Sequence, residues 1–226
     1  MQVGKEFAVL FAVLFLPGIV SQAGGVDPAG FEKLGYHLLI LVVSIPQLLM
    51  VLYVSNLRIP GSSSRFGWRR PSLRDGGTAL AGYVILIVSA LAISALISAI
   101  SVFIPSTGRA LLPQVEWRFS VPALIPMAVL SSVAIGYREE VFFRAYIVDR
   151  ASEIGVSTFS AVAGGTLLFA LGHLYQGLAG FGVALLLGAV LGALYVRTRS
   201  LHGVAVAHGL YNLTILLLSG ILPGTA

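Results

Sequence analysis

Four charged residues stand within seven positions of an otherwise apolar part of the chain. The segment from Arg138 to Arg144 reads Arg-Glu-Glu-Val-Phe-Phe-Arg and follows directly on the apolar run 121–137. A charged side chain at the centre of a membrane helix costs about 2.5–3.5 kcal/mol on insertion scales. Such charges usually mark a functional site, so this segment is the first candidate for chemistry.

The two glutamates of this segment have different neighbours if the segment is helical. Glu140 and Arg144 are four residues apart in the acid-then-base order, which lets them pair on one face. Glu139 points about 100° away. The residues one turn from it are apolar: Ile135, Gly136, Phe142 and Phe143. A poorly solvated carboxylate takes up protons readily, so we predict that Glu139 is a general base and that Glu140 and Arg144 form an orienting ion pair.

Three further polar residues lie in later apolar segments. His208 and Asn212 are four residues apart, as are Phe169 and His173, so each pair shares one face of a helix. Two histidines that lie opposite a desolvated Glu139 favour a catalytic site over separate structural roles.

Structural readings stay open for several of these residues. A single histidine in a membrane helix is often a hydrogen-bonded packing residue, and Asn212 can serve to hold helices together. An aromatic residue such as Phe169 more often belongs to the hydrophobic core than to the wall of a functional site. His37 and His202 lie near the ends of apolar segments, and we interpret them as structural.

Composition places the chain in a membrane. It has 226 residues, of which 57% are hydrophobic and 10% charged, and its mean hydropathy is +0.95. These values are far from those of soluble globular domains. Cysteine is absent, which excludes disulfides, thiol catalysis and thiolate metal sites. The net charge of +5 comes from basic residues between apolar segments, so it reports orientation in the bilayer and does not predict nucleic-acid binding.

The apolar segments predict an all-α, polytopic transmembrane bundle of about seven spans. The expected spans are 7–20, 36–55, 78–104, 121–137 with a helical continuation to about 150, 157–174, 178–196 and 201–218. Residues 1–120 would supply three spans and a basic cytoplasmic loop at 56–77, and residues 121–220 the catalytic core. Small residues at 184, 188 and 192 predict close helix packing.

The basic residues also predict an orientation. Eleven of the 14 Lys and Arg residues fall on the side of the N-terminus, which predicts a cytoplasmic N-terminus and an external C-terminus. A cleaved signal peptide over residues 1–23 is an alternative to a first span, because small residues follow the apolar run. Glu6, in what would be its basic region, argues against that alternative.

The depth of His173 is a difficulty for this simple arrangement. Near Gln176 the chain turns back, which places His173 only about 5 Å from the membrane face opposite to the one from which Glu139 is reached. A tilt of the helix over 157–174, or a break at Gly164-Gly165, would bring His173 deeper.

The ordered motifs resemble those of the CPBP intramembrane protease family, which includes CAAX prenyl protease 2 and abortive-infection-like proteins. The resemblance covers about residues 121–218 and rests on three motifs in order: Glu139-Glu140-x-x-x-Arg144, Phe169-x-x-x-His173 and His208-x-x-x-Asn212. It implies a helical membrane bundle that encloses the site. Ala145 departs from the pattern, since a glycine commonly follows the motif arginine.

The resemblance also implies residue roles. Glu139 and His173 would activate water, while His208 and Asn212 would stabilise the oxyanion. Bound zinc is possible, because a glutamate and two histidines can hold Zn²⁺ with an open position for water. It is not required, since the sequence has no HExxH motif and the ligands would come from three separate helices.

These observations predict an intramembrane endopeptidase, of glutamate or metalloprotease type, that cleaves a membrane-associated peptide or protein near a membrane-embedded or lipidated segment. We expect it in the inner membrane of a prokaryotic cell, with the lipid bilayer and the substrate as its partners. A non-catalytic immunity or scaffold protein of the same fold is one alternative. A proton-coupled carrier is another, because chains of Glu and His also build proton relays.

Overall fold

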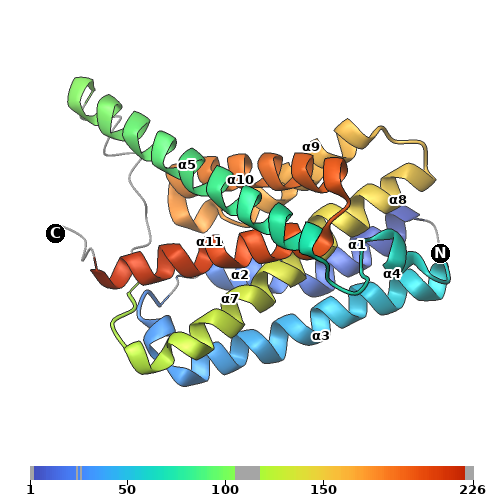
Figure 1. Cartoon of the computed structure of the whole chain (residues 1–226), viewed down its shortest axis with the longest axis horizontal. Helices are drawn as coiled ribbons and strands as arrows, with labels where there is room; N and C mark the ends of the chain where they lie inside the picture. Colours follow the sequence, from blue (N-terminus) through green and yellow to red (C-terminus); the bar gives the residue numbers. More distant parts are fainter. Residues whose placement is uncertain (1–2, 24, 26, 105–117, 222–226) are drawn as a thin grey trace.

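The computed structural model describes residues 3–23, 25, 27–104 and 118–221. Within these residues every regular element is helical, and no strand occurs (Figure 1). The elements are α1 (Val3–Leu14), α2 (Leu16–Ala23), η1 (Gly30–Glu32), α3 (Leu34–Arg58), α4 (Ser62–Arg65), α5 (Leu73–Phe103), η2 (Pro122–Leu124), α7 (Ile125–Glu140), η3 (Val141–Tyr146), α8 (Ile147–Glu153), α9 (Thr158–Leu171), η4 (Leu174–Gln176), α10 (Gly177–Thr198) and α11 (Leu201–Ile221). The predicted all-α bundle is confirmed. Residues 105–117, between the expected spans 78–104 and 121–137, lie outside the described residues.

Five stretches of helix are long and apolar enough to cross a membrane. They are Val3–Gln22, Leu34–Arg58, Leu73–Ile100, Leu174–Thr198 and Leu201–Gly220. The other two expected spans also exist as helices, but they do not meet the same criteria of length and hydropathy. The helical stretch from α7 to α8 carries charges, and α9 has 14 residues, about 21 Å of helix. The prediction of seven passes therefore overstates the number of helices that meet the length and hydropathy of a span.

The charged motif lies in one long helical stretch. α7 passes without a break through the π-helical turn η3 into α8, so helix continues from Ile125 to Glu153. This confirms the predicted continuation beyond residue 137. A π-helical turn inserts one extra residue and occurs often at functional sites. Here it begins directly after Glu140, between the paired glutamates and Arg144.

Small residues bring the neighbouring helices close to this stretch. A side chain at Gly136 of α7 would collide with the backbone of Ala205 and Gly209 in α11. In α10, a Cβ atom at Gly188 would lie 2.9 Å from Thr166 of α9, which confirms the predicted close packing. Of the two ways considered to bring His173 deeper, a break at Gly164-Gly165 does not occur, because α9 is continuous there.

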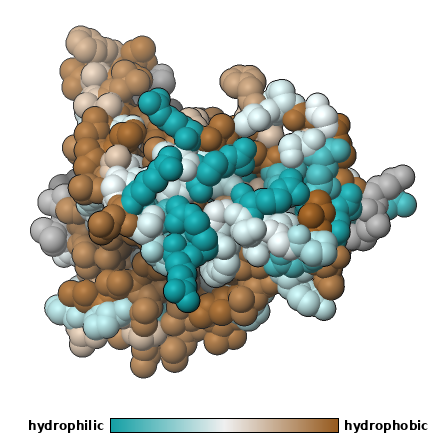
Figure 2. Space-filling view, turned by 45° about the vertical axis from the view of Figure 1, so that its right-hand side comes forward, coloured by the Kyte–Doolittle hydropathy of each residue, from teal (hydrophilic) through white to brown (hydrophobic). Residues whose placement is uncertain are grey.

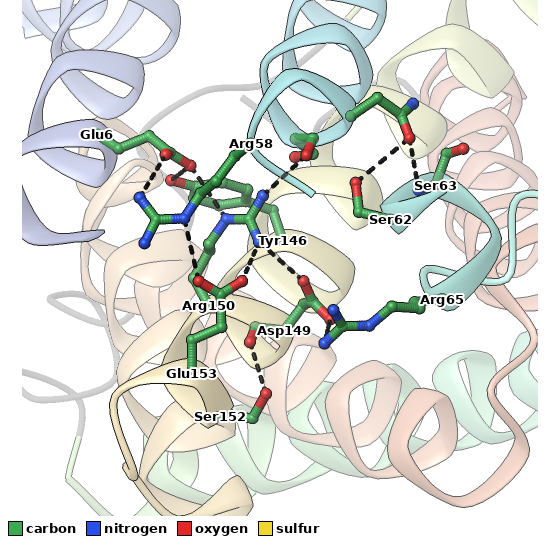
Figure 3. A network of polar contacts seen from close by, with 12 residues as sticks. Glu6, Arg58, Ser62, Ser63, Arg65, Tyr146, Asp149, Arg150, Ser152 and Glu153 are labelled. Atoms are coloured by element: carbon green, nitrogen blue, oxygen red, sulfur yellow. Dashed lines mark hydrogen bonds and ion pairs between the residues drawn. The ribbon is translucent and has the colours of Figure 1, made fainter. Parts of the chain in front are cut away.

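Six charged residues form a network where α1 begins and α3 ends, which we call the basal cluster (Figure 3). It consists of Glu6, Arg58, Arg65, Asp149, Arg150 and Glu153. Arg150 pairs with Glu6 at 3.0 Å and with Asp149 at 3.1 Å, and it also contacts Glu153. Arg58 pairs with Glu6 at 3.2 Å and with Glu153 at 3.1 Å. The basal cluster thus ties α1 and α3 to α8.

The basal cluster lies toward a polar end of the molecule. Figure 2 shows hydrophilic residues gathered at this end and hydrophobic surface around much of the remaining face. α1 starts here, whereas α11 ends on the opposite side of the bundle (Figure 1). This places the start of the first helix and the end of the last at opposite ends, as an odd number of crossings requires.

Candidate active site

All four predicted catalytic residues line one cavity. It has a volume of about 710 Å³, and Glu139, His173, His208 and Asn212 all contribute to its wall. They come from α7, from the turn after α9, and from α11. The structure therefore brings together residues that lie up to 73 positions apart in the sequence.

Glu139 is buried but has a partner that the sequence analysis did not foresee. Its side chain pairs through Oε1 with Arg138 Nη2 at 2.5 Å. The Arg138 guanidinium also lies over the ring of Phe15, 5.8 Å from its centroid. The expectation of a purely apolar surrounding is therefore wrong, because the residue before Glu139 folds back onto it. The other oxygen, Oε2, lies 3.8 Å from His208 Nε2, too far for a direct hydrogen bond.

Glu140 holds two partners at once. Its Oε2 lies 3.0 Å from Arg144 Nε, which confirms the predicted ion pair. Its Oε1 lies 2.8 Å from His208 Nδ1, a contact that helix spacing could not reveal because it joins two helices. Since a carboxylate only accepts hydrogen bonds, the Nδ1–H group of His208 donates this hydrogen bond to Glu140. This fixes the imidazole ring and turns Nε2 toward Glu139.

His173 reaches the cavity because α9 ends early. The helix stops at Leu171, and His173 follows in the short connection to η4. Its Nδ1 lies 2.8 Å from the carbonyl oxygen of Phe169, which can only accept, so Nδ1 carries the proton. Nε2 is left as an acceptor. His173 and Glu139 line the same cavity without a break in α9.

Phe169 contacts both histidines and the motif arginine. Its ring centroid lies 4.5 Å from that of His173 and 5.7 Å from that of His208. The Arg144 guanidinium lies over the same ring at 4.6 Å. Phe169 is buried, so it serves at once as core and as a wall between these groups.

Asn212 follows His208 by one helical turn and faces the same cavity. Its carboxamide makes no hydrogen bond to any residue that the structure describes, so it is available to a bound molecule. By contrast, His37 is buried and bonded to Ser131 Oγ at 2.8 Å. His202 lies 2.9 Å from the Tyr137 hydroxyl and 2.6 Å from the Arg69 carbonyl oxygen. Both have the hydrogen bonds that a structural role requires.

The N-terminal helices form the opposite wall of the cavity. Residues of α2 and α3 that line it include Ile19, Leu39, Ile40 and Val43, and Phe15 joins them from the link between α1 and α2. These apolar residues carry no chemical signature, and sequence reasoning missed them. The catalytic candidates thus come from the side of the three motifs, while the side of the first two spans is mainly apolar and adds the polar residues Gln22, Asp27 and Gln47.

The predicted zinc ligands share the cavity but do not form a ready metal site. Among the described residues, no group of three or more His, Cys, Asp or Glu side chains is arranged to hold a metal ion. Glu140 already engages His208 Nδ1, and Arg138 engages one oxygen of Glu139. The described residues as placed therefore do not fit a zinc ion.

One comparison with known proteins bears on this site. Residues 121–214 match a family model described as Type II CAAX prenyl endopeptidase Rce1-like. The match contains the four cavity residues, Glu140, Arg144 and Phe169, and it excludes the N-terminal wall. No curated protein and no solved structure matches the chain.

Proposed function

We propose that this integral membrane protein, whose residues 121–214 match the model of the type II CAAX prenyl endopeptidase Rce1-like family, is an intramembrane endopeptidase. Its substrate would be a peptide or protein with the scissile bond next to a membrane-embedded or lipidated segment. The observation that carries the proposal is the convergence of Glu139, His173, His208 and Asn212 on one cavity with an apolar opposite wall.

In the proposed reaction Glu139 and His173 activate water. Among the described residues, Glu139 Oε2 has no hydrogen-bond partner, and His208 Nε2 lies 3.8 Å away, so this oxygen would accept a proton from the water. His173 Nε2 would accept a hydrogen bond from the second O–H and orient the molecule. The water oxygen attacks the carbonyl carbon of the scissile bond and forms a tetrahedral oxyanion. When the C–N bond breaks, Glu139 returns its proton to the leaving amine.

The oxyanion needs donors on the other side of the carbonyl group. The Asn212 carboxamide lines the cavity and has no hydrogen bond to a described residue, so it would donate one to the oxyanion. His208 Nδ1 already donates to Glu140, so Nε2 can donate only when the ring carries both protons. Glu140 and Glu139 flank that ring at 2.8 and 3.8 Å and would stabilise its positive charge. Glu140 would therefore assist His208, besides pairing with Arg144.

The apolar wall suits a membrane-embedded or lipidated group. The family's name refers to prenyl endopeptidases, and a prenyl or other aliphatic chain would pack on Ile19, Leu39 and Val43. We place the protein in the inner membrane of a prokaryotic cell, with its N-terminus and the basal cluster on the cytoplasmic side, because that side holds most of the basic residues.

The decisive experiment compares membrane-peptide termini produced by wild type and Glu139→Gln in otherwise identical membranes. New termini should appear with the wild type and be lost with Glu139→Gln, which preserves shape but removes the base. Glu32→Gln is the matched control, because this glutamate lies outside the cavity and bonds to Ser120. Cleavage by correctly folded Glu139→Gln would reject the assignment of the base and the enzyme proposal with it.

The same membranes address the two alternatives. A scaffold or immunity protein would produce no new termini in either form yet retain its partner in Glu139→Gln. A proton-coupled carrier would move a solute in response to a pH gradient without any cleavage, and Glu139→Gln would stop that movement.

A further inference from the structure

We propose that Arg138 is a positioning residue, which keeps Glu139 ionised and directs one oxygen of its carboxylate into the cavity. The inference rests on the proposed function, since it assigns a role toward the base of that reaction. Arg138 belongs to none of the three motifs, whose first member begins at Glu139. Nothing in the helix periodicity singled it out.

The contact between the two side chains divides the carboxylate. Arg138 Nη2 binds Oε1 of Glu139 at 2.5 Å, which leaves Oε2 toward His208. A carboxylate without such a partner can rotate and exchange its two oxygens. Held on one side, it presents the same oxygen to water at every turnover, and correct placement is a large part of general-base efficiency.

The charge balance of the helix gives a second reason. Glu139 and Glu140 are adjacent and both buried, and two carboxylates that share a site resist ionising together. Arg144 pairs with Glu140, and the Arg138 guanidinium pairs with Glu139. Each glutamate thus has an arginine. Without Arg138, only Arg144 and His208 would be left nearby to offset the negative charges of the two glutamates.

The other groups that line the cavity near Glu139 cannot replace Arg138. They are His173 from the turn after α9, His208 from α11 and Tyr175 from η4. His173 presents an acceptor nitrogen to the cavity, and Tyr175 is neutral. The Nδ1–H group of His208 donates its hydrogen bond to Glu140. A permanent positive charge in contact with Glu139 therefore comes from Arg138.

The guanidinium is itself held in place by the N-terminal helix. It lies over the ring of Phe15, and that ring packs 4.7 Å from Phe142 and 4.8 Å from Phe143. The side chain of Arg138 is 21% exposed, and its Nε atom is buried without a hydrogen bond among the described residues. A cation over an aromatic face is attracted by the electrons of the ring. Phe15, outside the matched segment, thus helps to fix Arg138.

The test uses two substitutions of Arg138 in the full-length protein in liposomes. Arg138→Gln removes the charge, and Arg138→Lys keeps it. At pH 7 the Gln variant should lose about 10- to 100-fold in kcat, with KM close to that of the wild type, because part of Glu139 is protonated. The Lys variant should recover most of kcat. Arg197→Gln, a change at an exposed arginine of α10, is the matched control and should behave as the wild type.

Infrared spectroscopy gives a readout that needs no substrate. A protonated carboxyl band should appear at pH 7 in Arg138→Gln, be absent from Arg138→Lys, and disappear again in the double variant Arg138→Gln/Glu139→Gln. If Arg138→Gln fails to fold, the Lys variant still decides, since a carboxyl band assigned to Glu139 in that variant would overturn the inference.

Two other results would also overturn it. A rise in KM with unchanged kcat would make Arg138 a substrate-binding residue, and unchanged kcat without a carboxyl band would show that Glu139 needs no partner. If the wild type cleaves no peptide, the proposed function fails, and the infrared comparison alone then decides whether Arg138 holds the charge of Glu139.

Discussion

The same long helical stretch carries two buried groups of charges that differ in how completely they are paired. In the basal cluster, Glu6, Arg58 and Arg150 each contact at least two opposite charges. About three turns away, the site cluster consists of Arg138, Glu139, Glu140, Arg144 and His208. Four buried polar atoms of the site cluster lack hydrogen bonds among the described residues, and they belong to Arg138, Glu140 and Arg144. No such atom belongs to the charged residues of the basal cluster.

This difference separates a structural from a reactive arrangement. Buried polar groups in proteins are nearly always satisfied, and the exceptions call for a reason. The basal cluster is fully paired and joins helices from distant parts of the chain, as a structural tie requires. The site cluster lies beside a 710 Å³ cavity and keeps Glu139 Oε2 and Asn212 open. Glu139 and Asn212 line the cavity, so these are the groups of the site that water and a substrate can reach.

The largest stability effect is expected in the basal cluster. Arg150→Ala removes the one arginine that contacts all of Glu6, Asp149 and Glu153, although Arg58 still pairs with Glu6 and Glu153, and it should lower stability by about 3–5 kcal/mol. Thermal melting in detergent measures this effect, with exposed Arg197→Ala as the control. Residual folded protein at low temperature should keep the kcat of the wild type. An unchanged melting temperature would mean that water already solvates the basal cluster.

The next effect belongs to the site cluster and its cavity. Asn212→Ala removes one donor to the oxyanion and should reduce kcat by about 10²–10³-fold with little change in KM. Melting should stay close to that of the wild type, because the carboxamide has no partner among the described residues. Asn56→Ala, at the end of α3, is the matched control. Equal kcat values in Asn212→Ala and Asn56→Ala would show that Asn212 serves helix packing and does not stabilise the oxyanion.

Glu140→Gln probes the residue that belongs to structure and chemistry at once. The amide can still accept from His208 Nδ1, but it no longer offsets the charge of Arg144 or of a doubly protonated His208. Loss of a charge-assisted hydrogen bond corresponds to about 1.5–3 kcal/mol. We expect both kcat and the melting temperature to fall. A lower melting temperature with unchanged kcat would show that Glu140 has only a structural role, like the residues of the basal cluster.

The smallest expected effect is that of metal removal. Exhaustive chelation should leave both turnover and melting of the wild type unchanged, if Glu139 and His173 act on water directly. Elemental analysis of the chelated, active protein is the check. Strict metal dependence, restored by Zn²⁺ and lost in His208→Ala, would show instead that Glu139, His173 and His208 rearrange into ligands.

The sequence by itself determined the features that depend on helix periodicity. The i, i+4 spacing predicted the ion pair of Glu140 with Arg144, and the small residues of α10 predicted close packing against another helix, which the structure shows to be α9. The order of the three motifs led to the family that the match over residues 121–214 supports. Such patterns are local or motif-based, so they can be read without coordinates.

Only the tertiary structure decided which distant groups meet. His208 reaches Glu140 across 68 positions, and Arg150 reaches Glu6 across 144. It also decided that α9 ends at Leu171 rather than breaking at its glycine pair, and that Arg138 folds back on Glu139 beside Phe15. These outcomes depend on how whole helices pack and on the need to pair buried charges, and no short window of sequence contains that information.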